Sequence, residues 1–133
     1  MSKKNSSVIL KNNFKNYKEL FTIYSNFRKK INSFKNKSFL VAVSGGPDSL
    51  ALVALSKSYS YQHKCKIYYV LVDHSIRKNS SLEAKSVKKL LQKYQIKLNI
   101  LTNKKKIEKN IQSEARLIRY DLLSSFCKKK KIK

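Results

Sequence analysis

The chain of 133 residues carries 31 Lys and Arg against 7 Asp and Glu, a formal charge of +24, but only two glycines and one proline. This composition excludes collagen-like, Gly/Ser-linker and Pro-rich disordered proteins, and no apolar run reaches the roughly 18 residues of a membrane span. The 41% of apolar residues can form one small core, in a single domain or part of one. Because no secretory signal is visible, we expect no membrane partner and a location in the cytoplasm or an organelle matrix or stroma.

The positive charge has two interpretations. Each Lys or Arg that neutralises a phosphate adds affinity for nucleic acid that does not depend on base sequence. Lysines, however, outnumber arginines by 27 to 4, and an AT-rich coding sequence produces this Lys-, Asn- and Ile-rich composition without selection for binding. Both interpretations stay open at this stage. The two cysteines, Cys65 and Cys127, form no CxxC pair and no metal-ligand spacing with His63 or His74, so neither a zinc site nor a disulfide framework is expected.

Residues 1–36 are predicted to form a lead-in followed by an amphipathic helix. The first twelve residues are mostly polar and are expected to be poorly ordered. From Phe14 onward, apolar side chains recur at steps of three and four, which is the pattern of one helix face. This stripe consists of Phe14, Tyr17, Phe21, Tyr24, Phe27 and Ile31.

Residues 37–133 alternate between strand-like and helix-like segments. Continuous apolar runs at 39–43 and 67–72 predict strands that are buried on both faces, and 97–101 predicts a shorter third strand. A helix is expected after each strand. The order of one helix and then three strand–helix pairs predicts an α/β fold with a parallel sheet and helices on both faces.

The last two helices have recognisable start signals. Ser80 and Glu83 have the spacing of a capping box, in which each side chain satisfies an exposed backbone N–H group of the other residue. Asn110 is placed to cap the final helix. The side chains expected in the core are Leu82, Val87, Leu90 and Leu91 in the first of these helices and Ile111, Ala115, Ile118, Leu122 and Phe126 in the second.

The only glycines and the only proline stand together between the first strand and its helix, in the segment Ser44-Gly45-Gly46-Pro47-Asp48-Ser49. Ligands of parallel sheets bind at the carboxyl ends of the strands. Two glycines let the backbone adopt positive φ and approach an anion closely, and the helix that starts at Pro47 adds the positive end of its dipole. Ser44 and Ser49 supply hydroxyl groups, and the Asp48 carboxylate suits a phosphate site that also holds Mg²⁺.

This SGGPDS segment matches neither the P-loop lysine motif nor the dinucleotide GxGxxG motif. It resembles the SGGxDS signature of the PP-loop ATP pyrophosphatases, which split ATP into AMP and pyrophosphate. Two further segments resemble the tRNA(Ile)-lysidine synthases of that superfamily. One is Val72-Asp73-His74-Ser75-Ile76-Arg77, where Ser75 replaces the usual glycine of a VDHGLR segment. The other is residues 110–120, which is similar to an N-[LI]-[EQ]-x-x-A-R-x-x-R-Y helix.

The resemblance spans about residues 37–126 and implies an incomplete, Rossmann-like PP-loop ATP pyrophosphatase domain. In the implied reaction, ATP adenylates the C2 oxygen of the wobble cytidine of isoleucine tRNA, and free L-lysine displaces AMP to give lysidine. Ser44, Gly45, Gly46, Pro47, Asp48 and Ser49 are then expected to bind ATP, with Asp48 as the catalytic and Mg²⁺-binding carboxylate. Asp73, His74, Arg77, Arg116 and Arg119 are candidates for nucleotide or RNA contacts, while ion pairs and ordinary hydrogen bonds are the structural alternatives for them.

The family's later β-α units, its H-x-x-D-D-Q segment and its tRNA-binding regions have no match in these residues. The chain is therefore expected to be an N-terminal portion that binds ATP weakly and is not competent alone. Three alternatives remain. A PP-loop tRNA thiolation enzyme would use CxxC cysteines in its iron–sulfur form, and a small-molecule amidotransferase or synthetase would not need the 110–120 segment. A basic RNA-binding module without catalysis belongs to a different class.

Overall fold

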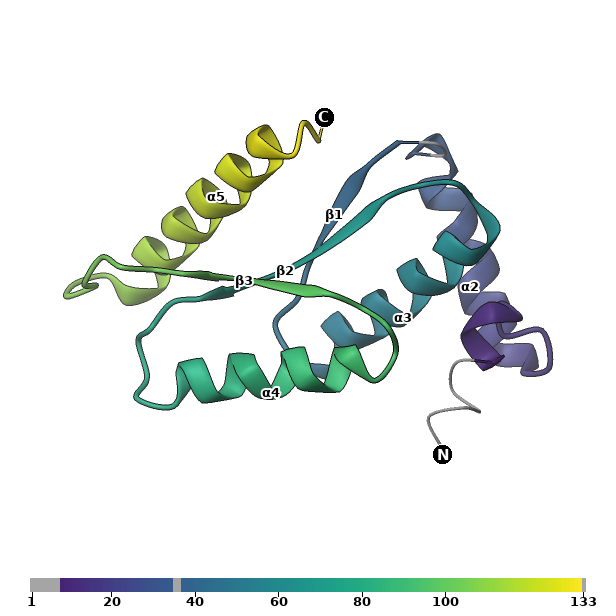
Figure 1. Ribbon diagram of the computed structural model, residues 1–133, viewed down its shortest axis with the longest axis horizontal. Coiled ribbons are helices and arrows are strands. Elements are labelled where there is room, and N and C mark those ends of the chain that lie inside the picture. The colour runs from purple at the N-terminus through teal and green to yellow at the C-terminus, as the bar shows by residue number, and fades with distance from the viewer. Residues whose placement is uncertain (1–7, 35–36, 133) are drawn as a thin grey trace.

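The computed structural model describes residues 8–34 and 37–132 (Figure 1). The predicted lead-in therefore lies partly outside the described residues, at 1–7. The elements in chain order are α2 (Lys18–Ile31), a 3-10 turn (Asn32–Phe34), β1 (Phe39–Ala42), α3 (Pro47–Gln62), β2 (Ile67–Asp73), α4 (Ser80–Gln92), β3 (Leu98–Thr102) and α5 (Ile111–Lys129).

The three strands form one parallel sheet in the order β1-β2-β3. Val41 lies opposite Tyr69 in the first pair of strands, and Tyr69 lies opposite Leu98 in the second. Both crossover helices, α3 and α4, cover one face of the sheet, and α5 lies across the other (Figure 1). This arrangement confirms the predicted α/β fold with helices on both faces.

The main core lies between the sheet and the helices α3 and α4. Its buried side chains come from alternate positions of the strands, such as Val41 and Tyr69, and from inward positions of the helices, such as Val53 and Leu91. The prediction that the first strand is buried on both faces is wrong, because Ala42 is exposed on the opposite face. The reason is that α5 packs over β2, where the ring of Phe126 meets the ring of Tyr68 edge-on. None of the residues of α5 is itself fully buried.

Helix α4 starts at the predicted residue but not by the predicted mechanism. Asn79 is the N-cap residue, and no side-chain capping bond forms there. The Glu83 carboxylate instead accepts a hydrogen bond from Arg77 at 2.8 Å, so the capping box is wrong. Leu82 and Leu90 are 61% and 38% exposed, because the face that meets the sheet is carried by Ala84, Val87 and Leu91 at steps of three and four.

The segment before α2 is more structured than the sequence suggested. Leu10 is buried, and Asn13 is buried although it is polar. The Asn13 Nδ2 group donates to the carbonyl and hydroxyl oxygens of Ser58 at 2.9 and 2.8 Å, which fastens this segment to α3. Phe14 does not start the helix, because both Asn13 and Phe14 adopt positive φ, yet its ring is buried against Tyr24. The expected disorder of residues 8–12 is therefore wrong.

Helix α5 carries the predicted stripe with less burial than expected. Asn110 occupies the N-cap position with a left-handed backbone, φ 49°, and its side chain makes no capping bond. Ile111 is 48% exposed, and the remaining stripe residues are half-buried. No helix among the described residues is long and apolar enough to span a membrane.

Candidate functional site

The loop of residues 44–49 joins the carboxyl end of β1 to the first turn of α3. Gly45 has φ 87°, a backbone conformation that side chains oppose. Gly46 has φ −75° and is the N-cap residue of α3, and Pro47 is the first helical residue, as predicted. Only one of the two glycines therefore uses the positive φ that the sequence analysis allowed both of them.

The loop leaves several backbone N–H groups for a ligand. The N–H of Ser44 donates to Ser49 Oγ at 2.8 Å, and the N–H of Gly46 reaches Ser44 Oγ at 3.4 Å. Within the described chain, no hydrogen bond uses the N–H groups of Gly45, Asp48 or Ser49. Because unpaired amides at a helix start attract anions, the geometry suits a phosphate group.

The contact of Gly45 with Val87 of α4 also requires glycine at this position. A Cβ atom added to Gly45 would lie 2.9 Å from Cγ2 of Val87, which is closer than real Cβ atoms approach. The same addition at Gly46 would meet nothing nearer than Ser44 Oγ, at 3.6 Å. The close contact lets α4 lie directly against the loop, so Gly45 serves both the backbone conformation and the packing.

The carboxyl end of β2 supplies the second part of the site. Asp73 is only 4% exposed, and its Oδ1 atom accepts a hydrogen bond from the N–H of Ser75 at 2.9 Å. Ser75 has φ 56°. The structure therefore places a left-handed residue at the position where the resemblance expects glycine.

A cavity of about 590 Å³ lies at the carboxyl ends of β1 and β2, between α4 and α5. It brings together five of the predicted site residues, from the loop, β2 and α5: Ser44, Asp73, His74, Arg77 and Arg119. The remaining loop residues, 45–49, and Arg116 do not line it. The cavity therefore adjoins the loop at Ser44 rather than containing it.

The predicted arginines have different partners, and two of them, Arg77 and Arg119, line this cavity. The guanidinium of Arg77 is paired with Glu83 at 2.8 Å, although both side chains are largely exposed. The guanidinium groups of Arg116 and Arg119 lie 5.7 and 5.8 Å from the centre of the Tyr120 ring. Tyr120 itself is 53% exposed, so this pair of arginines and its ring form an open surface on α5.

The surroundings of His74 favour the neutral form of its imidazole. Burial lowers the pKa of its imidazole, the Arg119 guanidinium lowers it further, and the Asp73 carboxylate opposes both effects. The buried Nδ1 atom of His74 has no hydrogen-bond partner among the described residues. An imidazole with a free nitrogen beside a cavity can accept or donate a hydrogen bond to a ligand.

Comparison with known proteins identifies the fold family. The PP-loop domain family matches residues 19–133, which is most of the chain. The chain belongs to the PP-loop domain family. Among its relatives, the tRNA(Ile)-lysidine synthase of Orientia tsutsugamushi (strain Boryong) is 41% identical over 96 residues, which are 70% of this chain and 21% of that protein.

Two further relatives have the same name. The tRNA(Ile)-lysidine synthase of Wolbachia pipientis wMel is 36% identical over 112 residues, 80% of this chain and 26% of that protein. The protein of that name from Lactobacillus gasseri is 35% identical over 119 residues, 81% of this chain and 26% of that protein. The chain thus spans about a fifth to a quarter of the length of these relatives. A PP-loop domain implies ATP binding.

The residues beside the PP-loop fit a magnesium ion only in combination with a ligand. No group of three His, Cys, Asp or Glu side chains gathers in the part of the chain that the structure describes. Asp48 is an exposed carboxylate in the first turn of α3. Because Mg²⁺ in nucleotide sites takes one or two carboxylates and completes its shell with water and phosphate oxygens, Asp48 fits such an ion bound together with ATP.

A residue next to the site, Asn103, was missed by the sequence analysis. Asn103 follows the last residue of β3 and is 6% exposed. Its N–H donates to the carbonyl of Asp73 at 2.8 Å, so the ladder between β2 and β3 continues beyond the strands. A signal was available, because a polar residue at the end of a parallel strand falls on the same edge as Ser44 and Asp73.

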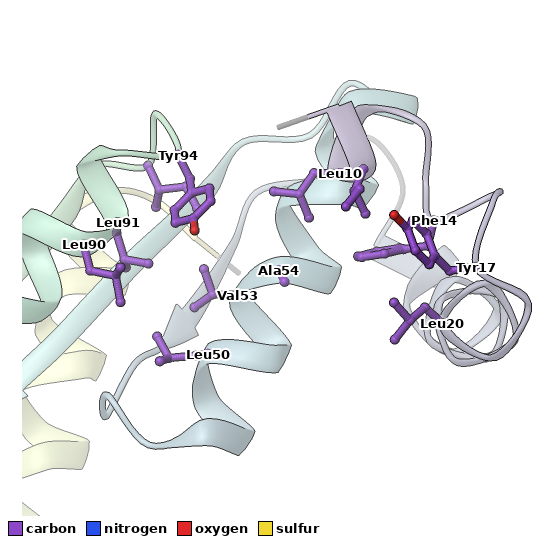
Figure 2. A pocket seen from close by; sticks show the side chains of 12 residues that line it. Leu10, Phe14, Tyr17, Leu20, Leu50, Val53, Ala54, Leu90, Leu91 and Tyr94 are labelled. Carbon is purple, nitrogen blue, oxygen red and sulfur yellow. The ribbon is translucent and has the colours of Figure 1, made fainter. Parts of the chain in front are cut away.

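A second cavity, of about 360 Å³, lies among α2, α3, α4 and the segment that precedes α2 (Figure 2). Its lining residues carry no charge, and most are aliphatic, such as Leu10, Leu50 and Leu91. It adjoins the buried side chains of Leu10, Phe14, Tyr24 and Tyr59, and it shares no lining residue with the first cavity. The chemistry of this PP-loop protein is therefore to be sought at the first cavity.

Ser75→Gly should stabilise the protein by about 0.5–1 kcal/mol, because glycine removes the left-handed strain at φ 56° while the N–H bond to Asp73 remains. Thermal or urea unfolding would measure the gain. The matched control is Ser81→Gly in the first turns of α4, which should lose about 0.5–1 kcal/mol because glycine weakens a regular helix. Destabilisation by both changes would contradict a strained backbone at Ser75.

Proposed function

We propose that this chain takes part in the ATP-dependent joining of lysine to the wobble cytidine of isoleucine tRNA. The observation that carries the proposal is the loop with three uncommitted N–H groups at the start of α3, beside a cavity that collects Asp73, His74 and Arg119. The names of the relatives supply tRNA(Ile) and lysidine, and the resemblance of the motifs supplies the steps of the reaction. The chain corresponds to about a quarter of those proteins or less. The complete activity is therefore proposed only for a protein that also has the functions of their remaining parts.

The first half-reaction needs a site for ATP. In our proposal, residues 44–49 hold the phosphates of ATP with their backbone N–H groups and hydroxyls. The C2 oxygen of cytosine attacks the α-phosphorus, the bond to the β-phosphate oxygen breaks, and pyrophosphate leaves. The amides stabilise the charge that develops on the phosphate oxygens. Mg²⁺, when bound at Asp48, would neutralise negative charge on the departing pyrophosphate.

The second half-reaction needs the adenylated base to face an amine. The ε-amine of free L-lysine attacks C2, and AMP leaves with the former C2 oxygen, so lysine becomes bonded to carbon through nitrogen. A base in an anticodon loop is unpaired and can enter a pocket, whereas a base in a duplex cannot. We assign Asp73, His74, Arg77 and Arg119 to contacts with the nucleotide or the RNA, and Arg116 to RNA on the outer side of α5.

The proposed organisation follows from these roles. Residues 37–133 would supply the amino-terminal part of the ATP-binding domain, and residues 1–36 would take no part in the reaction. Helix α2 of that region packs against α3. A non-catalytic basic RNA-binding protein is the competing function, since the +24 charge suits RNA whether or not ATP is used.

ATP binding and the modified tRNA separate these functions. On addition of Mg·ATP, we expect the amide NMR signals of Gly45, Asp48 and Ser49 to shift most. Depletion of the protein in its host should leave unmodified cytidine at the wobble position of isoleucine tRNA, measured by mass spectrometry of the nucleosides. If the amide signals of the loop do not shift on addition of Mg·ATP, the nucleotide site is refuted. Unchanged lysidine after depletion would refute the reaction and favour the non-catalytic alternative.

A further inference from the structure

Asn103 connects two parts of the chain that meet at the cavity. Its side-chain amide is buried at the carboxyl end of β3, directly before the exposed run Lys104-Lys105-Lys106. The Oδ1 atom accepts the N–H of Lys105 at 2.9 Å, and Nδ2 donates to the carbonyl of Lys105 at 2.7 Å. One side chain thus holds both polar groups of the Lys105 backbone and fixes the turn.

The same amide reaches across to β2. Nδ2 of Asn103 also lies 3.4 Å from the carbonyl oxygen of His74, and the backbone N–H of Asn103 bonds to the carbonyl of Asp73. Asp73 and His74 line the cavity, whereas Asn103 does not. Asn103 therefore bonds to the backbone of Asp73 and His74 without lining the cavity. It also bonds to the backbone of the turn at residues 104–106, which we call the lysine turn.

The lysine turn has the chemistry of a phosphate contact. The three lysines are exposed, and the ion pair of Lys106 with Glu108, at 3.7 Å, is exposed as well and therefore weak. Mobile lysines bind RNA phosphates through charge without fixing the position of the RNA. A buried amide bonded at both ends provides the rigid support that such lysines lack.

We infer that Asn103 is a positioning residue, which ties the lysine turn 104–106 to the backbone of His74. RNA phosphates bound to the turn then keep a constant position relative to the residues of the cavity. This inference rests on the proposed function, because it takes RNA as the ligand of the lysine turn. It concerns how RNA and the cavity are aligned, and it does not depend on adenylation by ATP or on lysine transfer.

Two variants of Asn103 and one of Asn99 isolate this role. Asn103→Asp keeps an acceptor for the N–H of Lys105 but cannot donate to the carbonyls of Lys105 and His74. Asn103→Ser keeps a short acceptor near the turn and cannot reach the His74 carbonyl. Asn99→Asp is the matched control, because Asn99 lies on the same strand and its Nδ2 donates to the carbonyl of Tyr69 at 3.3 Å, away from the cavity.

The readout is the imidazole NMR signal of His74 during titration with a short single-stranded RNA that contains cytidine. The chain has only two histidines, and His63, stacked on Tyr59 at the far end of α3, is an internal reference. RNA should shift the His74 signal in the wild type and in Asn99→Asp. Both Asn103 variants should bind RNA with little loss, because the lysines remain, while the His74 shift falls by about half or more.

Several results would overturn the inference. Equal His74 shifts in all four proteins would show that Asn103 does not link the two parts. An RNA that fails to bind, or that leaves His74 unmoved in the wild type, would overturn it without touching the ATP test of the proposed function. If both Asn103 variants fail to fold, hydrogen exchange in the wild type decides. The Lys105 amide must then exchange more slowly than those of Lys104 and Lys106.

Discussion

Gly45→Ala should destabilise the protein by about 2–4 kcal/mol, the largest stability effect we expect from one methyl group in this chain. Two costs add. A left-handed backbone costs a residue with Cβ about 1–2 kcal/mol, and φ is 87° here. The new Cβ would also lie 2.9 Å from Cγ2 of Val87, a stiff, branched side chain on a packed helix that cannot simply rotate away.

Thermal unfolding would show the change as a fall in Tm of roughly 10 °C for a chain of this size. Gly46→Ala is the matched control, because its φ is −75° and its Cβ would meet nothing nearer than 3.6 Å. We expect it to cost less than about 1 kcal/mol, while weakening ATP binding by adding bulk next to the amides of the loop. Equal destabilisation by the two changes would contradict the contact between the loop and α4.

The fold was predictable because its signals are local. The apolar runs of the three strands each contain enough neighbouring residues to mark an element, and the Gly-Gly-Pro cluster marks where the first strand must turn into a helix. The alternation of strands and helices then fixes a parallel sheet. The structure confirms this order from β1 to α5.

The wrong predictions concern residues whose partners stand far away in the chain, or whose partners replace the contacts of a local motif. Leu10 was expected in a disordered lead-in, but it is buried, and its carbonyl accepts a hydrogen bond from the hydroxyl of Ser58, which stands 48 positions later in the chain. Glu83 has the correct spacing for a capping box but binds Arg77 in the preceding loop instead. Leu82 and Leu90 are apolar yet exposed, because the face of α4 that meets the sheet is set by packing.

The sequence predicted some parts of the candidate site and missed others. The glycines located the loop, because a backbone that approaches an anion needs them, and the VDH segment located the end of β2. Asn103 was not found, since its importance lies in which backbone groups its amide reaches. The roles of Asp48, Arg116 and Arg119 stay predictions, because exposed side chains take their partners from ligands that the sequence does not contain.

Asp48→Asn should lower the formation of lysidine by about two to three orders of magnitude, in line with the loss of one group that stabilises transition-state charge. The change is to be made in the gene in its native context, and lysidine in isoleucine tRNA is measured after a short period of synthesis. The amide keeps the size of the side chain and one acceptor oxygen, but it replaces the other oxygen by an NH2 donor and removes the charge that would hold Mg²⁺ beside the phosphates of ATP. Added Mg²⁺ should tighten ATP binding in the wild type and have little effect in the variant.

The fold should survive this change, because the first-turn carboxylate contributes less than about 1 kcal/mol through the dipole of α3. Asp121→Asn is the control: Asp121 is also an exposed carboxylate in a helix, but it lies on α5, outside the loop of residues 44–49. It should leave both lysidine formation and the magnesium effect unchanged. Normal lysidine with Asp48→Asn would remove the carboxylate from the reaction and leave the loop as a site for phosphate alone. Loss of lysidine in both variants would instead point to a general effect of charge on tRNA binding.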